Sequence, residues 1–237
     1  MCLAALLGMS ALQGAWAGGE ASASLPVSHK HASFGQQQVS REVSALAAWI
    51  VHTADNQGMP FMIVDKVNAQ VLVLDKDGQL QGAAPALLGL ARGDDSTPGI
   101  GERKLSAILA HERTTPAGRF VASLDRNLHG VEILWIDYAT SISLHRVVKG
   151  TPAEQRARRL GSATSADNRV TFGCINVPVS FYDRVVSPAF TGTNSIVYIL
   201  PETRTAREVF GSYDVDEGTL PPAPTPSAAP VVQRPAP

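Results

Sequence analysis

Cys174 is the residue whose type and surroundings most clearly indicate chemistry in this sequence. It follows a short β-favouring run and stands four residues before Pro178, where we expect a helix to begin. A thiol near a helix N-terminus experiences the positive end of the helix dipole, which favours the nucleophilic thiolate. Gly173 lacks a Cβ, so the backbone amides of Gly173 and Cys174 could approach a carbonyl oxygen as oxyanion donors. The pattern predicts nucleophilic catalysis; the plain alternative is a small, buried and unreactive thiol.

A cysteine nucleophile needs a base within hydrogen-bonding distance, and the chain offers six histidines. His145 is the best placed, because alternation in a strand over 142–147 puts it on one face with Ser143, opposite the apolar side chains. His111 and His129 stand in loop-like segments and are the alternatives. The plain reading of His145 is a half-exposed strand histidine without a role.

Several classes of function find no support in the composition. No His-Glu-x-x-His or Cys-x-x-Cys motif occurs, so a zinc site is not predicted. The 20 Lys and Arg against 21 Asp and Glu give a net charge of -1, which lacks the positive field that non-specific binding to nucleic acid or anionic membranes requires. No stretch approaches 18 apolar residues, so we expect no membrane span.

The N-terminal segment has the pattern of a secretory signal. Residues 2–12 are almost all apolar or small, and Ala15-Trp16-Ala17 supplies the small-x-small pattern that signal peptidase recognises. A basic start is missing, which suggests that Met1 is an internal or truncated start. Cleavage after Ala17 removes Cys2 and leaves Cys174 unpaired in an oxidising compartment, where structural cysteines normally occur in pairs. We therefore expect a location in the periplasm or cell envelope.

The hydrophobic pattern predicts the elements that must position Cys174 and His145. Apolar residues at helical spacing after Ser40, a suitable N-cap, predict an amphipathic helix over 41–54. Asp77-Gly78 marks a turn between strands. Short β-favouring or apolar runs predict strands at 61–64, 71–75, 86–90, 119–124, 131–137, 142–147 and 196–200.

Two further segments separate these strands. Residues 91–118 are rich in turn formers and form a long excursion of the kind that often lines a site. Thr151-Pro152-Ala153-Glu154 has the capping-box pattern with Pro at N1 and predicts a helix over 152–160. That helix is expected to expose three arginines: Arg156, Arg158 and Arg159.

The domain organisation follows from these patterns. Seven of the 16 prolines lie in 221–237, and such a composition cannot bury enough apolar area to fold. We expect a signal peptide at 1–17, a flexible lead-in at 18–39, one catalytic domain at 40–210 and a disordered proline-rich tail at 211–237.

The residues around Cys174 resemble the signature of a bacterial cell-wall family, the L,D-transpeptidase catalytic domain (YkuD-type). In that family a strand histidine is followed, after a variable loop, by Ser/Thr-His-Gly-Cys-x-Arg. The matching positions here are His145, Thr171, Gly173 and Cys174. Upstream, the segment 115–120 (Thr-Pro-Ala-Gly-Arg-Phe) is similar to the family's Thr-Pro-x-Gly-x-Phe/Tyr turn. The resemblance covers about residues 60–201.

Three departures from the signature concern the groups that would orient a substrate. Phe172 replaces the histidine before Gly-Cys, Asn176 replaces the arginine, and the 29-residue interval from 145 to 174 is longer than the common spacing. The resemblance implies that the carbonyl of Arg146 orients His145. It also implies substrate-binding roles for Thr171, Phe172, Asn176, Arg146 and Arg169, the last of which could replace the lost arginine, as could Arg156, Arg158 or Arg159.

The resemblance implies a mainly β domain with a few short helices (α+β), a β-sandwich with an N-terminal helix. In it the Cys174 thiolate attacks the carbonyl of the third residue of a peptidoglycan stem tetrapeptide and expels the terminal D-alanine. An amine acceptor then gives a 3-3 cross-link or attaches a protein, whereas water gives L,D-carboxypeptidase activity. No cofactor is required, and carbapenems would bind covalently to Cys174. The alternatives are a catalytically silent cell-wall binding module and an unrelated cysteine peptidase.

Overall fold

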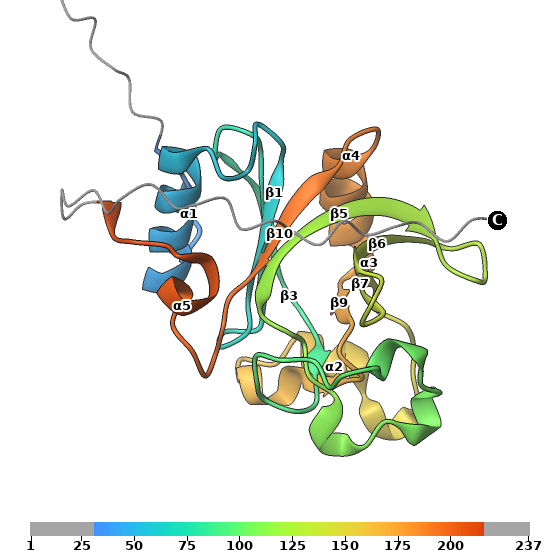
Figure 1. The fold of residues 1–237 in the computed structure, drawn as a ribbon. Helices are drawn as coiled ribbons and strands as arrows, with labels where there is room; N and C mark the ends of the chain where they lie inside the picture. The colour runs from blue at the N-terminus through green and yellow to red at the C-terminus, as the bar shows by residue number, and fades with distance from the viewer. Residues whose placement is uncertain (1–30, 216–237) are drawn as a thin grey trace, which may run out of the picture.

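The computed structural model describes residues 31–215, so the predicted signal segment and most of the predicted tail lie outside the described residues. Within this range one large mixed sheet dominates the molecule (Figure 1). Its strands are β1 (Phe61–Asp65), β2 (Gln70–Leu74), β3 (Leu80–Pro85), β5 (Gly118–Arg126), β6 (Glu132–Asp137), β7 (Ile142–Arg146), β9 (Ile175–Val177) and β10 (Ser195–Ile199).

The strand order is β3-β2-β1-β10-β5-β6-β7-β9. The β1–β10 and β7–β9 pairs are parallel and the others are antiparallel. A separate short pair is formed by β4 (Leu88–Gly89) and β8 (Arg169–Thr171). The β7–β9 pair therefore joins two segments that are far apart in the sequence. β7 carries His145, and β9 begins directly after Cys174.

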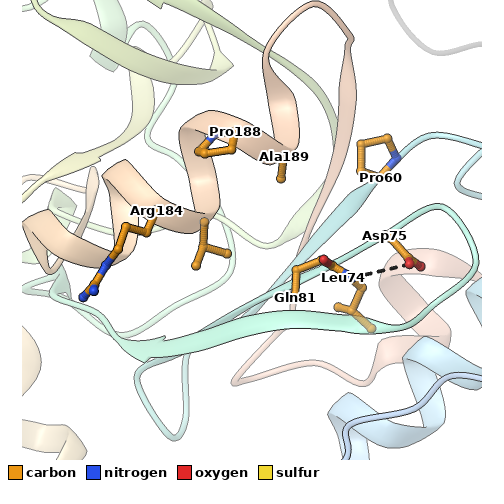
Figure 2. A pocket seen from close by; sticks show the side chains of 8 residues that line it. Pro60, Leu74, Asp75, Gln81, Arg184, Pro188 and Ala189 are labelled. Atoms are coloured by element: carbon orange, nitrogen blue, oxygen red, sulfur yellow. Dashed lines mark hydrogen bonds between the residues drawn. The ribbon is translucent and has the colours of Figure 1, made fainter.

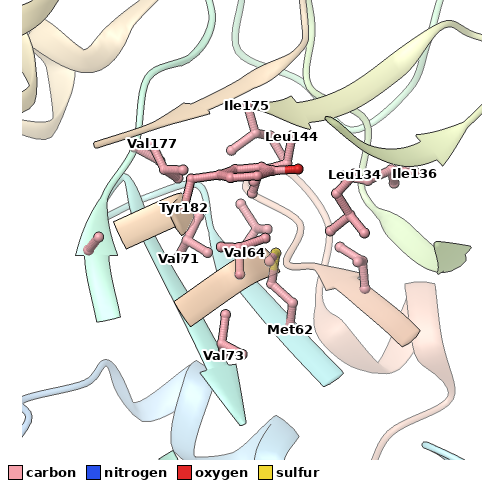
Figure 3. Close-up of a cluster of buried hydrophobic side chains, with 14 of the residues drawn as sticks. Met62, Val64, Val71, Val73, Leu134, Ile136, Leu144, Ile175, Val177 and Tyr182 are labelled. Carbon is pink, nitrogen blue, oxygen red and sulfur yellow. The ribbon is translucent and has the colours of Figure 1, made fainter. Parts of the chain in front are cut away.

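The long strand β5 lets the sheet fold over onto itself. Its first half pairs with β10 and its second half with β6, and the sheet curves along it (Figure 1). Side chains of β1 and β2 thus face those of β6, β7 and β9 across one core, with Tyr182 between them (Figure 3). The arrangement confirms the predicted mainly β class with a few short helices.

The N-terminal helix α1 (Arg41–Thr53) covers the outer face of this sheet. Ser40 is its N-cap, and the Ser40 hydroxyl accepts a hydrogen bond from the Val43 N–H at 3.3 Å. Its apolar face packs on the outward side chains of β1, β2 and β10, forming a second core. The predicted helix is confirmed, and the structure ends it one residue earlier. Burial of this face provides most of the helix's stability, since short isolated helices are marginal in water.

The contacts of this second core extend on both sides of the 40–210 unit expected from the sequence. Ser33 pairs with Gln79 beside the start of β3, and Phe34 packs against the core. At the other end, α5 (Ala206–Phe210) is followed by Tyr213 and Val215, which also pack there. Part of the predicted lead-in and the first tail residues are therefore packed against the sheet.

Of the predicted strand over 86–90, only the short β4 (Leu88–Gly89) forms, and it lies outside the large sheet. The chain forms β3 earlier, over 80–85, and the apolar run then leaves the sheet. Leu87 exchanges both backbone hydrogen bonds with Asn176, at 2.8 and 2.9 Å, and Leu90 donates to the carbonyl of Thr171 at 3.0 Å. The run is apolar because it is buried under the segment that carries Cys174, and an apolar run alone does not identify its partner.

The predicted helix over 152–160 is interrupted. Gln155 has φ 44° and ψ 42°, in the left-handed region, and divides the segment into η4 (Pro152–Glu154) and α2 (Arg156–Leu160). The capping box of the first turn is present, with Glu154 accepting from the Thr151 N–H at 3.1 Å. The break at Gln155 redirects the next residue, Arg156, toward β9.

The remaining helical segments are short. After Pro178 come α3 (Val179–Phe181), the π-helical η6 (Tyr182–Val186) and α4 (Ser187–Phe190), so the helix continues through Pro188. The excursion over 91–118 contains η1 (Ile100–Glu102), η2 (Leu105–Ala107) and η3 (Ala110–Glu112), and η5 (Ser165–Asn168) precedes β8. In the range 31–215, no helix has the length and apolar character that crossing a bilayer would take.

Candidate active site

Strand register brings the sulfur of Cys174 against β7. Leu144 pairs with Ile175 and both face the core, so Ser143 and His145 on the opposite face lie next to Cys174. The Ser143 hydroxyl donates to the Cys174 Sγ at 3.6 Å, and the thiol lies 3.5 Å from the Ser141 carbonyl oxygen, to which it can donate. The thiol is free and partly exposed. The structure therefore places the predicted nucleophile within a set of polar groups rather than in hydrocarbon.

His145 lies on the same face of β7 as Ser143, beside Cys174, and His145 and Cys174 alter each other's acidity. Burial raises the pKa of the Cys174 thiol, but its interactions with His145 and Ser143 outweigh burial, so that pKa lies below its ordinary value. Burial lowers the pKa of His145, but the interaction with Cys174 outweighs it and the net shift is upward. Both directions favour transfer of the thiol proton to the imidazole.

The helix dipole does not activate Cys174, contrary to the sequence-based expectation. Strand β9 intervenes between the thiol and the helix that begins at Val179. The lowering of the thiol pKa comes instead from His145 and Ser143. The alternation of β7, which puts Ser143 on the same face as His145, is the sequence signal that could have identified Ser143.

Both ring nitrogens of His145 have partners that define its tautomer. Nδ1 lies 2.8 Å from the carbonyl oxygen of Arg146, which can only accept, so Nδ1 carries the proton. Nε2 lies 3.1 Å from the Asn176 side-chain nitrogen. The Asn176 oxygen is identified by Arg156, whose Nη1 donates to it at 2.9 Å. Nε2 is therefore the unprotonated nitrogen of the resting imidazole, which is the nitrogen that a base needs.

Arg156 is part of the site rather than an exposed helix residue. Its side chain is only 11% exposed, and Glu154 accepts from its Nε at 2.9 Å. Its positive charge opposes the upward shift of the His145 pKa. Arg158 is exposed and bonds to Gln155, as the sequence predicts. Arg156 could not be distinguished in the sequence, because its position depends on the left-handed conformation at Gln155.

The turn before Cys174 requires glycine and constrains the oxyanion donors. Gly173 has φ +129°, and a Cβ there would lie 2.8 Å from both the Ile142 Cδ1 and the Thr114 carbonyl oxygen. The Gly173 N–H donates to the Thr171 hydroxyl at 3.1 Å, and that hydroxyl donates to the Cys174 carbonyl at 2.7 Å. The predicted Gly173 oxyanion donor is therefore already committed, which leaves the Cys174 N–H for that role. Thr171 stabilises the turn.

Phe172 occupies the position of the histidine in the family signature and packs beside the thiol. Arg113 lies over its ring, with the guanidinium carbon 3.9 Å from the ring centre. The Arg113 guanidinium also donates to the Ile108 carbonyl at 3.2 and 3.3 Å. Phe172 thus joins the excursion over 91–118 to the Cys174 turn. Arg113 lies in a segment without hydrophobic periodicity, so no sequence signal singled it out.

Arg169 does not lie with the other predicted site residues. Its guanidinium pairs with buried Glu202 at 2.6 Å and donates to the Lys66 carbonyl at 2.8 Å. The same buried cluster contains Lys66 and Asp94, paired at 2.8 Å. Arg169 is 8% exposed and holds the end of β1 to the C-terminal segment, so it is not available to replace the family arginine.

A pocket of about 190 Å³ opens beside Cys174 under the excursion over 91–118. Its polar and charged lining residues are Ser96, Arg103, Thr114, Thr140, Ser141 and Cys174, and its apolar lining includes Ile100, Leu105, Ile108, Ile142 and Phe172. A space of this size is smaller than the cavities that hold drug-sized ligands, so it suits one end of an extended substrate.

A second pocket, of about 300 Å³, shares no lining residue with the first (Figure 2). It lies between the start of β1 and the helical segment after β9. Its charged side chains, Asp75 and Arg184, already have partners: Asp75 accepts from Gln81 at 3.4 Å and Arg184 donates to the Ser180 carbonyl at 3.2 Å. It contains no nucleophile or histidine, so Cys174 remains the candidate centre of chemistry.

No histidine of residues 31–215, His145 included, is among the residues that line the Cys174 pocket. His111 and His129 are exposed, in η3 and in the turn between β5 and β6, and His52 lies on α1 against Tyr213. Among residues 31–215, no three His, Cys, Asp or Glu side chains come together as a metal ion would require.

The sequence matches no known family profile and no curated protein. Among solved structures, the chain is similar to the L,D-transpeptidase LdtMt1 in complex with imipenem, with 15% identity over 60% of this chain and 58% of that one, and a TM-score of 0.38. It is also similar to the helical cell shape determining protein Pgp2 from Campylobacter jejuni, with 14% identity, coverage of 62% and 49%, and a TM-score of 0.43.

A third similar structure is the catalytic domain of an L,D-transpeptidase from E. faecium, with 17% identity over 60% of this chain and 96% of that one, and a TM-score of 0.35. The chain thus spans between 49% and 58% of the first two structures and nearly all of the third.

Proposed function

We propose that this protein is a cysteine acyltransferase of the L,D-transpeptidase type, which acts on peptidoglycan stem peptides through a thioester acyl-enzyme in the periplasm or cell envelope. The observation that carries the proposal is the placement of His145 and Ser143 on one face of β7 beside Cys174, which lines a pocket and whose thiol pKa is lowered. The resemblance of the motifs around these residues to the transpeptidase signature supplies the substrate class.

In the first step the Cys174 thiol transfers its proton to Nε2 of His145, and the thiolate attacks the carbonyl carbon of the third residue of a stem tetrapeptide. A C–S bond forms, and the negative charge moves onto the carbonyl oxygen, beside the Cys174 N–H. The C–N bond to the terminal D-alanine then breaks, and the His145 proton passes to the leaving amine. The products are a thioester on Cys174 and free D-alanine.

In the second step the thioester is resolved by a nucleophile that occupies the place of the departed D-alanine. His145, again neutral, accepts the proton of an incoming amine, the new C–N bond forms and the C–S bond breaks. An amine on a second stem gives a 3-3 cross-link, and an amine on a protein gives protein attachment. Water in the same place gives L,D-carboxypeptidase activity.

The groups around His145 suit this alternation between base and acid. Arg146 holds Nδ1–H through its carbonyl, so the ring keeps its orientation while Nε2 gains and loses a proton. Asn176 donates to Nε2 in the resting state and must release it when the proton arrives. A thiol that approaches Nε2 therefore competes with the Asn176 amide.

A catalytically silent cell-wall binding module is the second candidate, favoured by the loss of the signature histidine at Phe172 and of the arginine at Asn176. The two candidates differ in the state of the thiol. A binding module has no need for a thiol with a lowered pKa, a hydroxyl donor at 3.6 Å and an oriented imidazole. These groups favour the enzyme.

The test is incubation of the protein with purified tetrapeptide muropeptides and identification of the products by mass. We expect cross-linked dimers or tripeptides from the wild-type protein, and neither from Cys174→Ala or His145→Ala. His129→Ala, which removes an exposed histidine from the β5–β6 turn, should leave the products unchanged. Dimers indicate transpeptidation and tripeptides alone indicate hydrolysis. Tight muropeptide binding without turnover would support the binding module.

A carbapenem offers an independent probe of the same sulfur. Exposure of the wild-type protein should increase its intact mass by one adduct, and Cys174→Ala should stay unmodified. An unmodified wild-type mass after prolonged exposure would contradict the acyl-enzyme mechanism.

A further inference from the structure

The pocket beside Cys174 contains a cation that the chemistry of the Cys174–His145 pair leaves unused. Arg103 is the charged residue among those that line it. It lies just after η1, in the excursion over 91–118, and belongs to none of the motifs that resemble the transpeptidase signature. The walls around it are mainly apolar, from Ile100, Leu105 and Ile108.

The segment that carries Arg103 is fixed to the turn that contacts the sulfur. The backbone of Gly101 packs so closely on Ala139 that a Cβ would lie 2.3 Å from the Ala139 carbonyl oxygen. The Ser141 hydroxyl donates to the Gly101 carbonyl at 3.1 Å, and the Ser141 carbonyl lies 3.5 Å from the Cys174 Sγ. Arg103 is thus two residues from Gly101, which is hydrogen-bonded to Ser141, and Ser141 contacts the Cys174 thiol.

The guanidinium of Arg103 is only partly satisfied. Its Nη2 donates to the Glu112 carboxylate at 2.7 Å, and its side chain is 33% exposed. The Nε atom is buried and has no hydrogen-bond partner. Protein atoms shield Nε, so a ligand in the pocket meets the exposed part of the guanidinium, where Nη2 alone is bonded to Glu112. A carboxylate is the anion that a guanidinium binds with the best geometry.

We propose that Arg103 binds the terminal carboxylate of the acyl donor, so that the pocket recognises a small amino acid with a free C-terminus. The proposal rests on the proposed function, in which the bond cleaved lies one residue from the end of the donor peptide. When the thiol attacks that bond, the last residue occupies the pocket and its carboxylate reaches past the apolar wall to Arg103. The small volume and the apolar lining fit a residue with a methyl side chain.

Glu112 limits the affinity of this site. Its hydrogen bonds from Arg103 and from the Leu109 N–H keep the pKa of Glu112 below its ordinary value, so it stays ionised. An incoming carboxylate therefore shares Arg103 with an existing anion. Moderate affinity suits a leaving group, because the departing amino acid must vacate the pocket for the acceptor.

The test compares alkylation of Cys174 by iodoacetate and by iodoacetamide, which have nearly the same size and differ in charge. Both reagents form the same C–S bond to the thiolate and release iodide, so the ratio of their rates cancels the reactivity of the thiol itself. We expect Arg103→Gln to lower the iodoacetate-to-iodoacetamide ratio by about threefold or more, since it removes a positive charge from the lining of the pocket that the reagent enters. Glu112→Gln should raise the ratio, because Arg103 then loses its internal anion.

Two further variants serve as controls. Arg41→Gln makes the same change in charge on the exposed N-terminal end of α1, across the sheet from the pocket, and should leave the ratio unchanged (Figure 1). Arg103→Lys keeps the charge and should keep most of the preference. Should Arg103→Gln fail to fold, the higher ratio expected of Glu112→Gln is the test, and an unchanged ratio there would overturn the proposal. An unchanged ratio in Arg103→Gln, or equal effects of Arg103→Gln and Arg41→Gln, would overturn the proposal.

Peptide substrates separate this inference from the proposed function. With a tetrapeptide and its C-terminal amide, we expect the wild-type protein to favour the free acid through a lower KM, and Arg103→Gln to remove that preference. If tetrapeptides are turned over and the preference persists in Arg103→Gln, the role of Arg103 is wrong and the proposed function stands. If neither peptide reacts while the alkylation ratio responds as predicted, the carboxylate site stands and the stem-peptide function does not.

Discussion

The hydroxyl of Thr115 donates to the carbonyl of Gly173 at 2.7 Å, across a sequence separation of 58 residues. The same hydroxyl accepts from the N–H of Gly89 at 2.9 Å, and the Thr115 carbonyl accepts from Lys66 Nζ at 3.0 Å. The Thr-Pro turn is therefore a support for the Cys174 turn, and it links that turn to the buried ion cluster behind it. A motif identified by resemblance alone thus has a physical role in this chain.

Replacement of Thr115 by valine removes both hydrogen bonds and keeps the side-chain volume. Two buried backbone groups, the Gly89 N–H and the Gly173 carbonyl, lose a partner, and we expect the free energy of unfolding to fall by about 2–4 kcal/mol. Urea unfolding measures this loss. Thr115→Ser keeps the hydroxyl and should recover most of the stability; equal losses in the two variants would contradict the role of the hydrogen bonds.

Gly173→Ala tests the conformation of the Cys174 turn. The new Cβ would lie 2.8 Å from the Thr114 carbonyl oxygen, a backbone atom that cannot move aside, at a φ of +129°. We expect a loss of stability of about 2 kcal/mol or more and, in the variant that still folds, slower alkylation of Cys174 by iodoacetamide. Gly192→Ala, in an open turn where a Cβ meets nothing within 4 Å, controls for the backbone effect alone. If Cys174 in Gly173→Ala is alkylated as fast as in the wild-type protein, the Cys174 turn does not require glycine at this position.

Local pattern predicted much of this fold because the deciding interactions are close in sequence. The Ser40 cap and the apolar spacing after it specify α1, and the alternation around His145 specifies the face that it shares with Ser143. The proximity of His145 and Cys174 came from the resemblance of their motifs, since nothing local joins residues that are 29 positions apart. The structure brings them together through the parallel register of β7 and β9.

The parts that could not be predicted depend on non-local contacts. The apolar run at 86–90 was expected to be a strand, and its pairing with Asn176 depends on a segment almost 90 residues later. The place of Arg156 depends on a left-handed Gln155, a conformation that sequence patterns rarely indicate outside glycine and asparagine. Arg103 lies in a segment without periodicity, where only the packed structure shows what a side chain faces.

The pairing of His145 with Cys174 predicts the pH dependence of thiol reactivity. The thiolate is the reactive form, so alkylation by iodoacetamide should rise with pH through a midpoint below the ordinary cysteine value of about 8.5. His145→Asn removes the partner that stabilises the thiolate and should move that midpoint up by about 1–2 pH units. The measurement is the alkylation rate at a series of pH values. His129→Asn should leave the midpoint in place, and a wild-type midpoint at or above 8.5 would contradict the proposed activation.

The buried Asp94 carboxylate predicts a loss of stability in acid. Burial raises its pKa, but hydrogen bonds from Lys66 and Thr203 outweigh burial and hold that pKa well below its ordinary value. The folded state therefore binds a proton on Asp94 less readily than the unfolded state does. The stability that Asp94 provides is complete above its unfolded pKa, about 3.9, and declines as the pH falls toward the folded value.

Asp94→Asn should consequently lower the free energy of unfolding at pH 7 by about 3 kcal/mol or more, because it leaves Lys66 buried without its anion. The variant should also lose less stability than the wild type between pH 5 and about pH 2. Urea unfolding across this range tests both statements. Asp95→Asn is the matched control, since Asp95 is 81% exposed and pairs only at the surface, where an ion pair contributes little. Parallel acid curves for wild type and Asp94→Asn would refute the assignment.

Arg156 lowers the proton affinity of His145, and Asn176, which is hydrogen-bonded to both residues, transmits part of this effect. While Arg156 donates to the Asn176 oxygen, the amide nitrogen faces Nε2 and disfavours a proton there; the charge of Arg156 acts in the same direction. Arg156→Gln removes the charge and frees the Asn176 amide to turn its oxygen toward Nε2–H. We therefore expect the His145 pKa to rise, and NMR titration of the imidazole protons measures it. Arg158→Gln, a neighbouring exposed arginine on the same helix, should produce no comparable rise. A His145 pKa that is unchanged or lower in Arg156→Gln would mean that Asn176 does not transmit the effect of Arg156 to the ring.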